Sequence, residues 1–481
     1  MNLLAAKKRF LEILGSDGVL DDSDSLVSYS SDYTEEPPQL PSLVVLPQTA
    51  EQVQEIVKIA NEEQCTLTPR VTASNVGGLA IPPVGGVVVD LHRMRKIIEV
   101  NQEDMYALIE PGVTWEQLKS HLEESNIPLR LGYPLSPPDT SIVANCLLDG
   151  LGNLSMRYGS MADWIGGIEA VLPDGQLIKT GAAALSNFWF GRGPLPDLTG
   201  LFVCWQGTTG IVTKMAFQLW PLPPHRQRMF ILTYDRNAAF SAMRDLCRIQ
   251  VCDDVGGLSW PTGKMLFGVQ KPEARDPAEP EFFLYLDISG QTERELNLRL
   301  EILKQYLEQL RSRGFAVEDP LDIRTLVKLN PEFAKLAEFP TRLGFLVDHP
   351  GGGLSWVGTY GPLSQFEKFA DGAIRLMNTY KRPPIVVSRP MNGGHFGVMR
   401  FISTFDKSNQ DECRIVREIN EKLVDLGLEF GFIPYKTPPW VVEKIRSRLD
   451  PAFMNVMQKI RATIDPNRIM SPRCWPMRGP G

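Results

Sequence analysis

The segment between Pro41 and Asp90 alternates short runs of β-branched residues with one helical pattern. The strand-like runs are SLVVLP, TLTP and GGVVVDL, and the helix lies between the first two. Thr49 and Gln52 have the spacing of a capping box at its start. The expected buried face of the helix consists of Val53, Ile56, Val57 and Ala60. This order predicts a small strand–helix–strand–strand unit, as found in compact α/β subdomains.

The chain that follows is rich in turns. A second helix is predicted from Thr114, with Gln117 three residues on, and its apolar face consists of Trp115, Leu118 and Leu122. From Gly132 to Gly210 we expect short strands interrupted by glycine and proline. The run GIVTKMAFQLWPLPP reads as a strand closed by prolines, so a domain boundary is expected near Pro224.

Beyond His225 the pattern changes to strands alternating with longer helices. The clearest helix is ERELNLRLEILKQYLEQLRSRG, in which Gly314 has the position of a C-terminal cap. The stretch KPEARDPAEPE is rich in proline and charge and is expected to be a loop. We therefore expect a separate domain over residues 225–432.

Charge and cysteine content exclude several classes of protein. The net charge of -7 leaves no broad basic surface, so nucleic acid is not an expected partner. Seven cysteines without a CxxC pair disfavour a disulfide framework or a metal knuckle, and a reducing cytoplasm is expected. No run approaches the ~20 apolar residues of a membrane span. The N-terminus reads instead as an amphipathic helix with Leu3, Lys7, Phe10 and Leu14 at helical spacing.

Two common nucleotide motifs are missing. No GxGxxG follows the first strand, and no GxxxxGK[ST] occurs, which disfavours a Rossmann NAD site and a P-loop. His92, His121, His225 and His349 show no metal-ligand spacing with one another, so no metal is predicted.

Six stretches in series resemble the vanillyl-alcohol oxidase/p-cresol methylhydroxylase family of FAD-linked flavoproteins. Each is short, and the signal comes from their order along nearly the whole chain. They are PSLVVLPQTAEQVQEIVKIA, PRVTASNVGGLAIPPVGGVVVDLHRM, EPGVTWEQL, RYGSMADWIGGIEAVLPDG, PDLTGLFVCWQGTTGIVTK and DPNRIMSP.

The resemblance implies an α+β fold with FAD as cofactor. A two-subdomain FAD-binding domain is expected at residues 1–224, and an α+β cap domain that binds substrate at 225–432. The C-terminal segment, residues 433–481, is expected to return to the FAD domain and pack on it.

The first flavin contacts are expected in a loop after the second strand. FAD carries a pyrophosphate, and a tight loop of small residues can bind such an anion through main-chain N–H groups. The family's loop is richer in glycine, and here Ser74 and Asn75 could donate from their side chains instead. The alternative is an ordinary connecting loop. The implied contacts are Arg70, Val71, Thr72, Ala73, Ser74, Asn75 and Gly77.

A second set of flavin contacts is implied further along the first half. Alternatively, its glycines serve only to allow positive φ in turns. The residues are Pro138, Ser141, Asn145, Gly150, Gly152, Ile168, Gly207, Gly210 and Val212.

Candidate catalytic residues lie mostly near the C-terminus. Tyr435 and Lys436 match a Tyr-Arg pair that binds phenolic substrates in the family, or else end a surface strand. His395, in a glycine-flanked turn, and Arg400 on the strand after it are candidates for substrate contact, although a lone histidine is often structural. Asp139 lies near the place of the oxidase branch's acid–base aspartate and could equally cap the next turn.

Differences from each branch leave the substrate open. The hydroxy-acid branch carries GHxGDGNxH and GEHG motifs, of which only GGHFG is present, and Val76 stands where the phenol branch has a tyrosine. The sequence VMRFIST lacks the histidine that tethers FAD in vanillyl-alcohol oxidase, so non-covalent FAD is predicted.

Three functional hypotheses follow from the resemblance. The leading one is an FAD-dependent dehydrogenase or oxidase that transfers a hydride from a small aromatic alcohol or alkylphenol to flavin N5. The alternatives are a glycolate- or D-lactate-type 2-hydroxy-acid dehydrogenase and a non-catalytic flavin-binding subunit of a redox complex. An unidentified electron acceptor or redox partner protein is implied. A homodimer is expected because dimers are common in this family.

Overall fold

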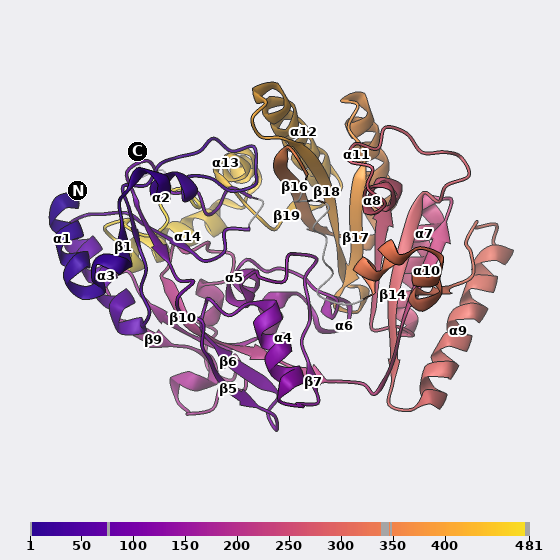
Figure 1. The fold of residues 1–481 in the computed structure, drawn as a ribbon, viewed down its shortest axis with the longest axis horizontal. Coiled ribbons are helices and arrows are strands. Elements are labelled where there is room, and N and C mark those ends of the chain that lie inside the picture. Colours follow the sequence, from indigo (N-terminus) through magenta and orange to yellow (C-terminus); the bar gives the residue numbers. More distant parts are fainter. Residues whose placement is uncertain (1, 75–76, 338–345, 347–348, 477–481) are drawn as a thin grey trace.

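The computed structural model describes residues 2–74, 77–337, 346 and 349–476 and has an α+β fold (Figure 1). The first half of the chain forms two small sheets and a separate two-stranded pair, and most of the second half forms one large sheet with helices on it. No helix in these residues is long and apolar enough to cross a membrane.

The first sheet contains the predicted strand–helix–strand–strand unit. Its order is β1 (Val19–Leu20), β2 (Leu43–Val45), β4 (Val87–Asp90) and β3 (Leu67–Arg70), with β2, β4 and β3 parallel. The helices beside it are α1 (Leu3–Leu14), α2 (Ser23–Ser28) and α3 (Ala50–Glu62).

The predicted start of α3 is confirmed, with one difference. The Thr49 hydroxyl accepts the backbone N–H of Gln52, as a capping residue does. The Gln52 side chain, however, accepts from the N–H of Gln48, one residue before the cap. The predicted amphipathic helix at the N-terminus is α1: Phe10 is buried, Leu3 and Leu14 pack against the same core, and Lys7 forms an ion pair with Asp21.

The second sheet is antiparallel, in the order β5 (Ile97–Asn101), β6 (Tyr106–Ile109), β10 (Ile211–Gln218), β8 (Ile165–Val171) and β9 (Leu177–Lys179). The predicted helix after Thr114 is α4 (Trp115–Glu124), and it buries Trp115, Leu118 and Leu122 as expected. Beside the sheet, β7 (Leu129–Arg130) pairs with β11 (Trp220–Pro221).

The short strands expected between Gly132 and Gly210 are found in part, as β8 and β9, whereas residues 132–164 form no strand of these sheets. Two short helices, α5 (Ile142–Leu147) and α6 (Ser155–Tyr158), occupy part of this segment. The reason is local: the Ser141 hydroxyl accepts the N–H of Ala144 and caps α5, so the chain turns into a helix at that point.

The large sheet has eight strands, in the order β15 (Leu321–Asp322), β12 (His225–Thr233), β14 (Phe282–Gly290), β13 (Asp254–Ser259), β17 (Ile385–Met391), β18 (Phe396–Asp406), β16 (Gly352–Gly361) and β19 (Ile433–Pro434). All its neighbouring strands are antiparallel.

Alternation along the strands separates the two faces of this sheet. On β18, Met399 and Phe401 pack into the core formed with four helices, whereas Ile402 belongs to a different cluster. The four helices are α7 (Arg236–Ile249), α9 (Glu293–Ser312), α11 (Phe366–Thr379) and α12 (Gln410–Glu429). The shorter α8 (Trp260–Leu266) and α10 (Ile323–Leu329) pack against the other cluster. Residues at alternate β18 positions, Arg400 among them, therefore face away from the four helices.

The C-terminal segment lies beside the first sheet, where yellow meets indigo in Figure 1. After α13 (Pro439–Ile445) and α14 (Pro451–Ile464), the chain pairs with β3: the Leu67 N–H donates to Ile469 O and the Ser471 N–H donates to Leu67 O. Ile469 and Met470 are buried with α1 and α3 in one core.

Candidate active site

A cavity of about 1410 Å³, its open mouth included, lies between loops of the first half of the chain and the large sheet. Residues 69–74 and parts of the segments 134–151 and 206–212 contribute to one side. Trp356 of β16, Arg400 of β18 and the pair Tyr435–Lys436 after β19 contribute to the other. A ligand bound in this cavity would therefore contact both the loops of the first half and the large sheet.

The described part of the predicted phosphate loop lines this cavity, from Arg70 to Ser74. The Arg70 guanidinium is already engaged: it donates to Tyr29 O at 3.0 Å and lies 4.6 Å from the Tyr29 ring centroid. Main-chain groups of this loop therefore remain for a ligand, beside the hydroxyls of Thr72 and Ser74, which hydrogen-bond to each other at 3.2 Å. Asn75 lies outside the described residues, and Gly77 lines a separate, smaller cavity.

Only some of the residues in the second predicted set of flavin contacts line the cavity. Six of its residues line the cavity, namely Ser141, Asn145, Gly150, Gly207, Gly210 and Val212. Pro138, Gly152 and Ile168 do not. Ile168 is fully buried in the core of the second sheet, and Gly152 backs against the main chain of Tyr133, so neither has a free side toward the cavity.

Packing explains two of the lining glycines. Gly207 has φ of 75°, and a Cβ there would lie 2.7 Å from Pro69 Cγ. A Cβ at Gly210 would lie 2.5 Å from Val171 O. Gln206, next to Gly207, connects this loop to the C-terminal segment: its side-chain Nε2 donates to Thr437 Oγ1 at 2.6 Å. The other atom of the same side-chain amide, Oε1, is buried without a hydrogen-bond partner. That orphaned acceptor fits a ligand that donates a hydrogen bond.

The residues present fit FAD. Small residues and loop main chain form one part of the cavity wall, which suits a pyrophosphate, and apolar side chains such as Leu151 and Val212 suit a flat ring system. The ring-bearing end would then lie near the aromatic and cationic side chains of the large sheet.

Tyr435 is fixed at that end by its backbone and by stacking. Its N–H donates to Gly358 O at 3.2 Å, and its ring stacks on Tyr360 with centroids 4.8 Å apart. A Cβ at Gly358 would lie 2.5 Å from the Tyr435 ring, so glycine leaves the space that the ring occupies. The Tyr435 hydroxyl is buried and has no hydrogen-bond partner, which leaves it free to bind a ligand.

Two cations lie near the same rings. Arg400 lies 5.5 Å from the Trp356 centroid and 5.7 Å from that of Tyr435, and Lys436 Nζ lies 5.0 Å and 6.0 Å from the same two centroids. Neither cation has a hydrogen bond or ion pair with another described residue. Burial and the charge of Arg400 lower the pKa of Lys436 to about 7, against an opposing effect of Asp32. Buried cations without a counter-ion are costly, so the site is suited to an anion or a developing negative charge.

The structure does not bring His395 or Asp139 to this cavity. His395 is exposed after the turn Asn392–Gly394, which connects the end of β17 to the start of β18. Asp139 is exposed as well, and its neighbour Thr140 is the residue that reaches the cavity. The sequence did not single out Trp356 or Gln206. One feature of the sequence could have pointed to Trp356: it lies in a glycine-rich strand, where Gly358 leaves the space that the Tyr435 ring occupies.

Comparison with known proteins supports the same cofactor. An FAD binding domain model matches residues 41–181. The chain is 27% identical to the 4-cresol dehydrogenase [hydroxylating] flavoprotein subunit of Pseudomonas putida, over 97% of this chain and 94% of the relative. It is 25% identical to the mitochondrial D-lactate dehydrogenase [cytochrome] of Arabidopsis thaliana, over 90% of this chain and 73% of the relative.

Among solved structures, substrate-bound p-cresol methylhydroxylase superposes with a TM-score of 0.86 at 25% identity, covering 98% of this chain and 97% of the other. Within the described residues, no three His, Cys, Asp or Glu side chains lie together as a metal site would require.

Proposed function

The chain belongs to the FAD-linked flavoproteins of the p-cresol methylhydroxylase type, and on that premise we propose that it oxidises a small aromatic alcohol or an alkylphenol. It is an FAD-dependent oxidoreductase. The observation that carries the proposal is the position of Tyr435 and Lys436 in the same cavity as the loops expected to hold FAD. Bound FAD supplies the acceptor for a hydride from the substrate carbon.

The residues of the large sheet bind and polarise the substrate. Trp356 and Tyr435 offer aromatic surface to a substrate ring, and the free Tyr435 hydroxyl donates a hydrogen bond to its oxygen. Lys436, with its pKa of about 7, takes the proton of the substrate O–H when it is neutral. Arg400 stabilises the negative charge that remains on the oxygen.

Anaerobic mixing with candidate substrates tests this function. Aromatic alcohols and 4-alkylphenols should bleach the flavin absorbance near ~450 nm. Tyr435→Phe should slow bleaching by about 10–100-fold while FAD stays bound, because only the donated hydrogen bond is lost. Bleaching by hydroxy acids and not by any aromatic compound would contradict the proposal.

A 2-hydroxy-acid dehydrogenase is the second candidate. Two unpaired cations, Arg400 and Lys436, suit a carboxylate, and one relative is a D-lactate dehydrogenase. Bleaching by D-lactate or glycolate, together with metal in the protein and loss of activity on chelation, would favour this candidate.

The electrons are proposed to leave to an acceptor or a redox partner protein, because the relative from Pseudomonas putida is named as a flavoprotein subunit. After substrate has reduced the flavin, protein without its partner is expected to be reoxidised only when an artificial electron acceptor is added.

A further inference from the structure

Lys436 is the one lysine among the described residues that line the large cavity. Its Nζ lies 5.0 Å from the ring centroid of Trp356 and 6.0 Å from that of Tyr435, so the amine lies beside two aromatic walls of the cavity. Within the described part of the chain, no group forms a hydrogen bond or an ion pair with this amine. It is therefore free to react with a flat ligand that enters the cavity.

The surroundings of this amine favour its neutral form. The Arg400 guanidinium lies 5.5 Å and 5.7 Å from the same two ring centroids, which places a second cation at the same walls. Burial and, after it, the charge of Arg400 lower the pKa of Lys436 to about 7, whereas Asp32 acts in the opposite direction. An amine that has lost its proton has a free electron pair, and desolvation beside another cation is one way in which proteins make a lysine nucleophilic.

The Tyr435 hydroxyl provides a hydrogen-bond donor in the same cavity. It is buried without a partner, and its ring is held by stacking on Tyr360, with centroids 4.8 Å apart. Such a hydroxyl can donate to the oxygen of a bound carbonyl group and make the carbonyl carbon more electrophilic. Trp356 and apolar side chains such as Leu151 offer more contact to an aromatic ring than to a short alkyl chain.

We propose that Lys436 is a carbonyl-capture site that forms an imine with aromatic aldehydes entering this cavity. The Nζ electron pair forms a bond to the carbonyl carbon, and the carbonyl oxygen takes up a proton. The resulting carbinolamine loses water as the C=N bond forms. Amine and aldehyde thus give imine and water, with no oxidant or reductant consumed. This reaction goes beyond the proposed function, because it needs no electron transfer to FAD. An aromatic alcohol oxidised in the same cavity would yield such an aldehyde.

Reductive trapping of the holoenzyme with benzaldehyde and sodium cyanoborohydride at pH 7 tests this proposal. The reductant converts the imine to a stable secondary amine, which mass spectrometry detects after denaturation and tryptic digestion. We expect one benzyl group on Lys436, formed at least about a hundredfold faster than on lysines at the surface, because those amines are almost fully protonated at pH 7. Trypsin should then no longer cleave after Lys436.

Acetaldehyde separates capture by the cavity from a low pKa alone. The α-amino group of the chain serves as the reference, since its ordinary pKa of about 8 also leaves part of it neutral at pH 7. Benzaldehyde should label Lys436 at least about tenfold faster than the α-amino group, whereas acetaldehyde, which has no ring, should not show this preference. Equal preference for the two aldehydes would overturn the role of the aromatic walls.

Lys436→Arg keeps a cation but has no nucleophilic amine, and it should abolish the fast labelling. Lys444→Arg is the matched control: Lys444 lies on α13 and pairs with Asp425 at 2.8 Å, so the fast labelling should be as in wild type. Wild-type protein labelled on surface amines, with Lys436 unmodified, would overturn the proposal without any variant. If aromatic alcohols bleach the flavin of that same protein, the proposed function still stands. Labelled Lys436 in protein whose flavin no aromatic compound bleaches would support carbonyl capture and contradict the proposed function.

Discussion

Lys436 is a partly buried cation, and the lowered pKa that suits its proposed role also reduces the stability of the folded protein. Burial lowers its pKa to about 7, whereas the amine of an unfolded chain keeps a value of 10.5. The folded protein therefore binds fewer protons than the unfolded chain between these two values, so the stability of the wild type rises with pH across that window.

Lys436→Met should stabilise the protein, because it removes a buried charge and keeps an apolar stem of similar length. We expect a gain of about 1–4 kcal/mol in the free energy of unfolding below pH 7, shrinking between pH 7 and 10.5. Urea unfolding at several pH values, with FAD matched, checks the result. A variant less stable than wild type below pH 7 would show that Lys436 has a counter-ion.

Gly358→Ala should disturb the site through Tyr435. The added methyl group would lie 2.5 Å from the tyrosine ring, so the ring must leave its place on Tyr360. We expect a loss of about 1–3 kcal/mol in stability and a weaker affinity for phenols. Gly191→Ala is the control, because nothing lies within 4 Å of its added Cβ. Equal phenol affinity in both variants would contradict the role of Gly358.

For single residues, the sequence indicated which side chains could take part in a site, but not reliably which of them lie at the same place in the fold. Tyr435, Lys436 and Arg400 were singled out from the chain alone, and all three line one cavity. His395 and Asp139 were singled out on the same grounds and are exposed elsewhere. A side chain's direction depends on strand register, which places Arg400 opposite Gly358 and which local sequence does not encode.

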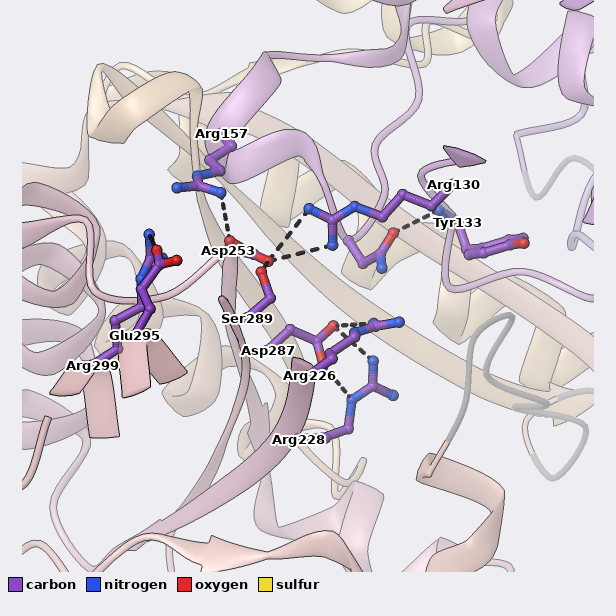
Figure 2. Close-up of polar contacts among 11 residues, drawn as sticks. Arg130, Tyr133, Arg157, Arg226, Arg228, Asp253, Asp287, Ser289, Glu295 and Arg299 are labelled. Atoms are coloured by element: carbon purple, nitrogen blue, oxygen red, sulfur yellow. Dashed lines mark hydrogen bonds and ion pairs between the residues drawn. The ribbon is translucent and has the colours of Figure 1, made fainter. Parts of the chain in front are cut away.

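Among the elements, buried ion pairs connect the first half of the chain to the large sheet (Figure 2). Asp253, just before β13, accepts from Arg130 of β7, from Arg157 of α6 at 2.6 Å and from Ser289 of β14. Its side chain is 1% exposed. These contacts hold the sheet that carries Trp356 and Arg400 at a fixed position relative to the first half of the chain, whose loops are expected to hold FAD.

Asp253→Asn should therefore destabilise the junction strongly. Asparagine keeps the shape of the side chain but leaves the buried Arg130 without a counter-charge, at a cost of about 3–5 kcal/mol. Glu295→Gln is the control: Glu295 pairs with Arg299 one turn away within α9, at the surface of the same region (Figure 2), and no measurable change is expected. Similar thermal unfolding midpoints for the two variants would show that the junction does not depend on these ion pairs.

Capped helices were predicted well, because capping is local. Thr49, Thr114 and Thr292 each accept the N–H of the third residue on, at the start of a helix the sequence had indicated. The segment around α5 and α6 was not, since helices of six and four residues carry too little periodic signal. The Arg130–Asp253 contact joins residues 123 positions apart and has no sequence signature.

In the whole molecule, the cavity is formed where segments that are far apart in the sequence come together. The first half supplies loops, the large sheet supplies aromatic and cationic side chains, and the C-terminal segment pairs with β3 and lies against Gly207 at Ser471. The order of six family-like stretches predicted the fold from sequence, whereas the substrate depends on the side chains inside the cavity.

FAD should be dissociable. No histidine or cysteine lies among the described residues that line the cavity, and Tyr435 is the one tyrosine there. Acid or heat denaturation should therefore release all the flavin into the supernatant. Flavin fluorescence that stays on the protein band in a denaturing gel would contradict this, and Tyr435→Phe would then identify or exclude that residue as the point of attachment.

The account depends above all on FAD binding in the cavity between the two halves. Calorimetric titration of flavin-free protein with FAD measures this directly. We expect one FAD per chain, with FMN at least about tenfold weaker because it lacks the second phosphate and the adenosine that the loops are expected to hold. A flat titration with FAD, on protein shown to be folded, would contradict the account.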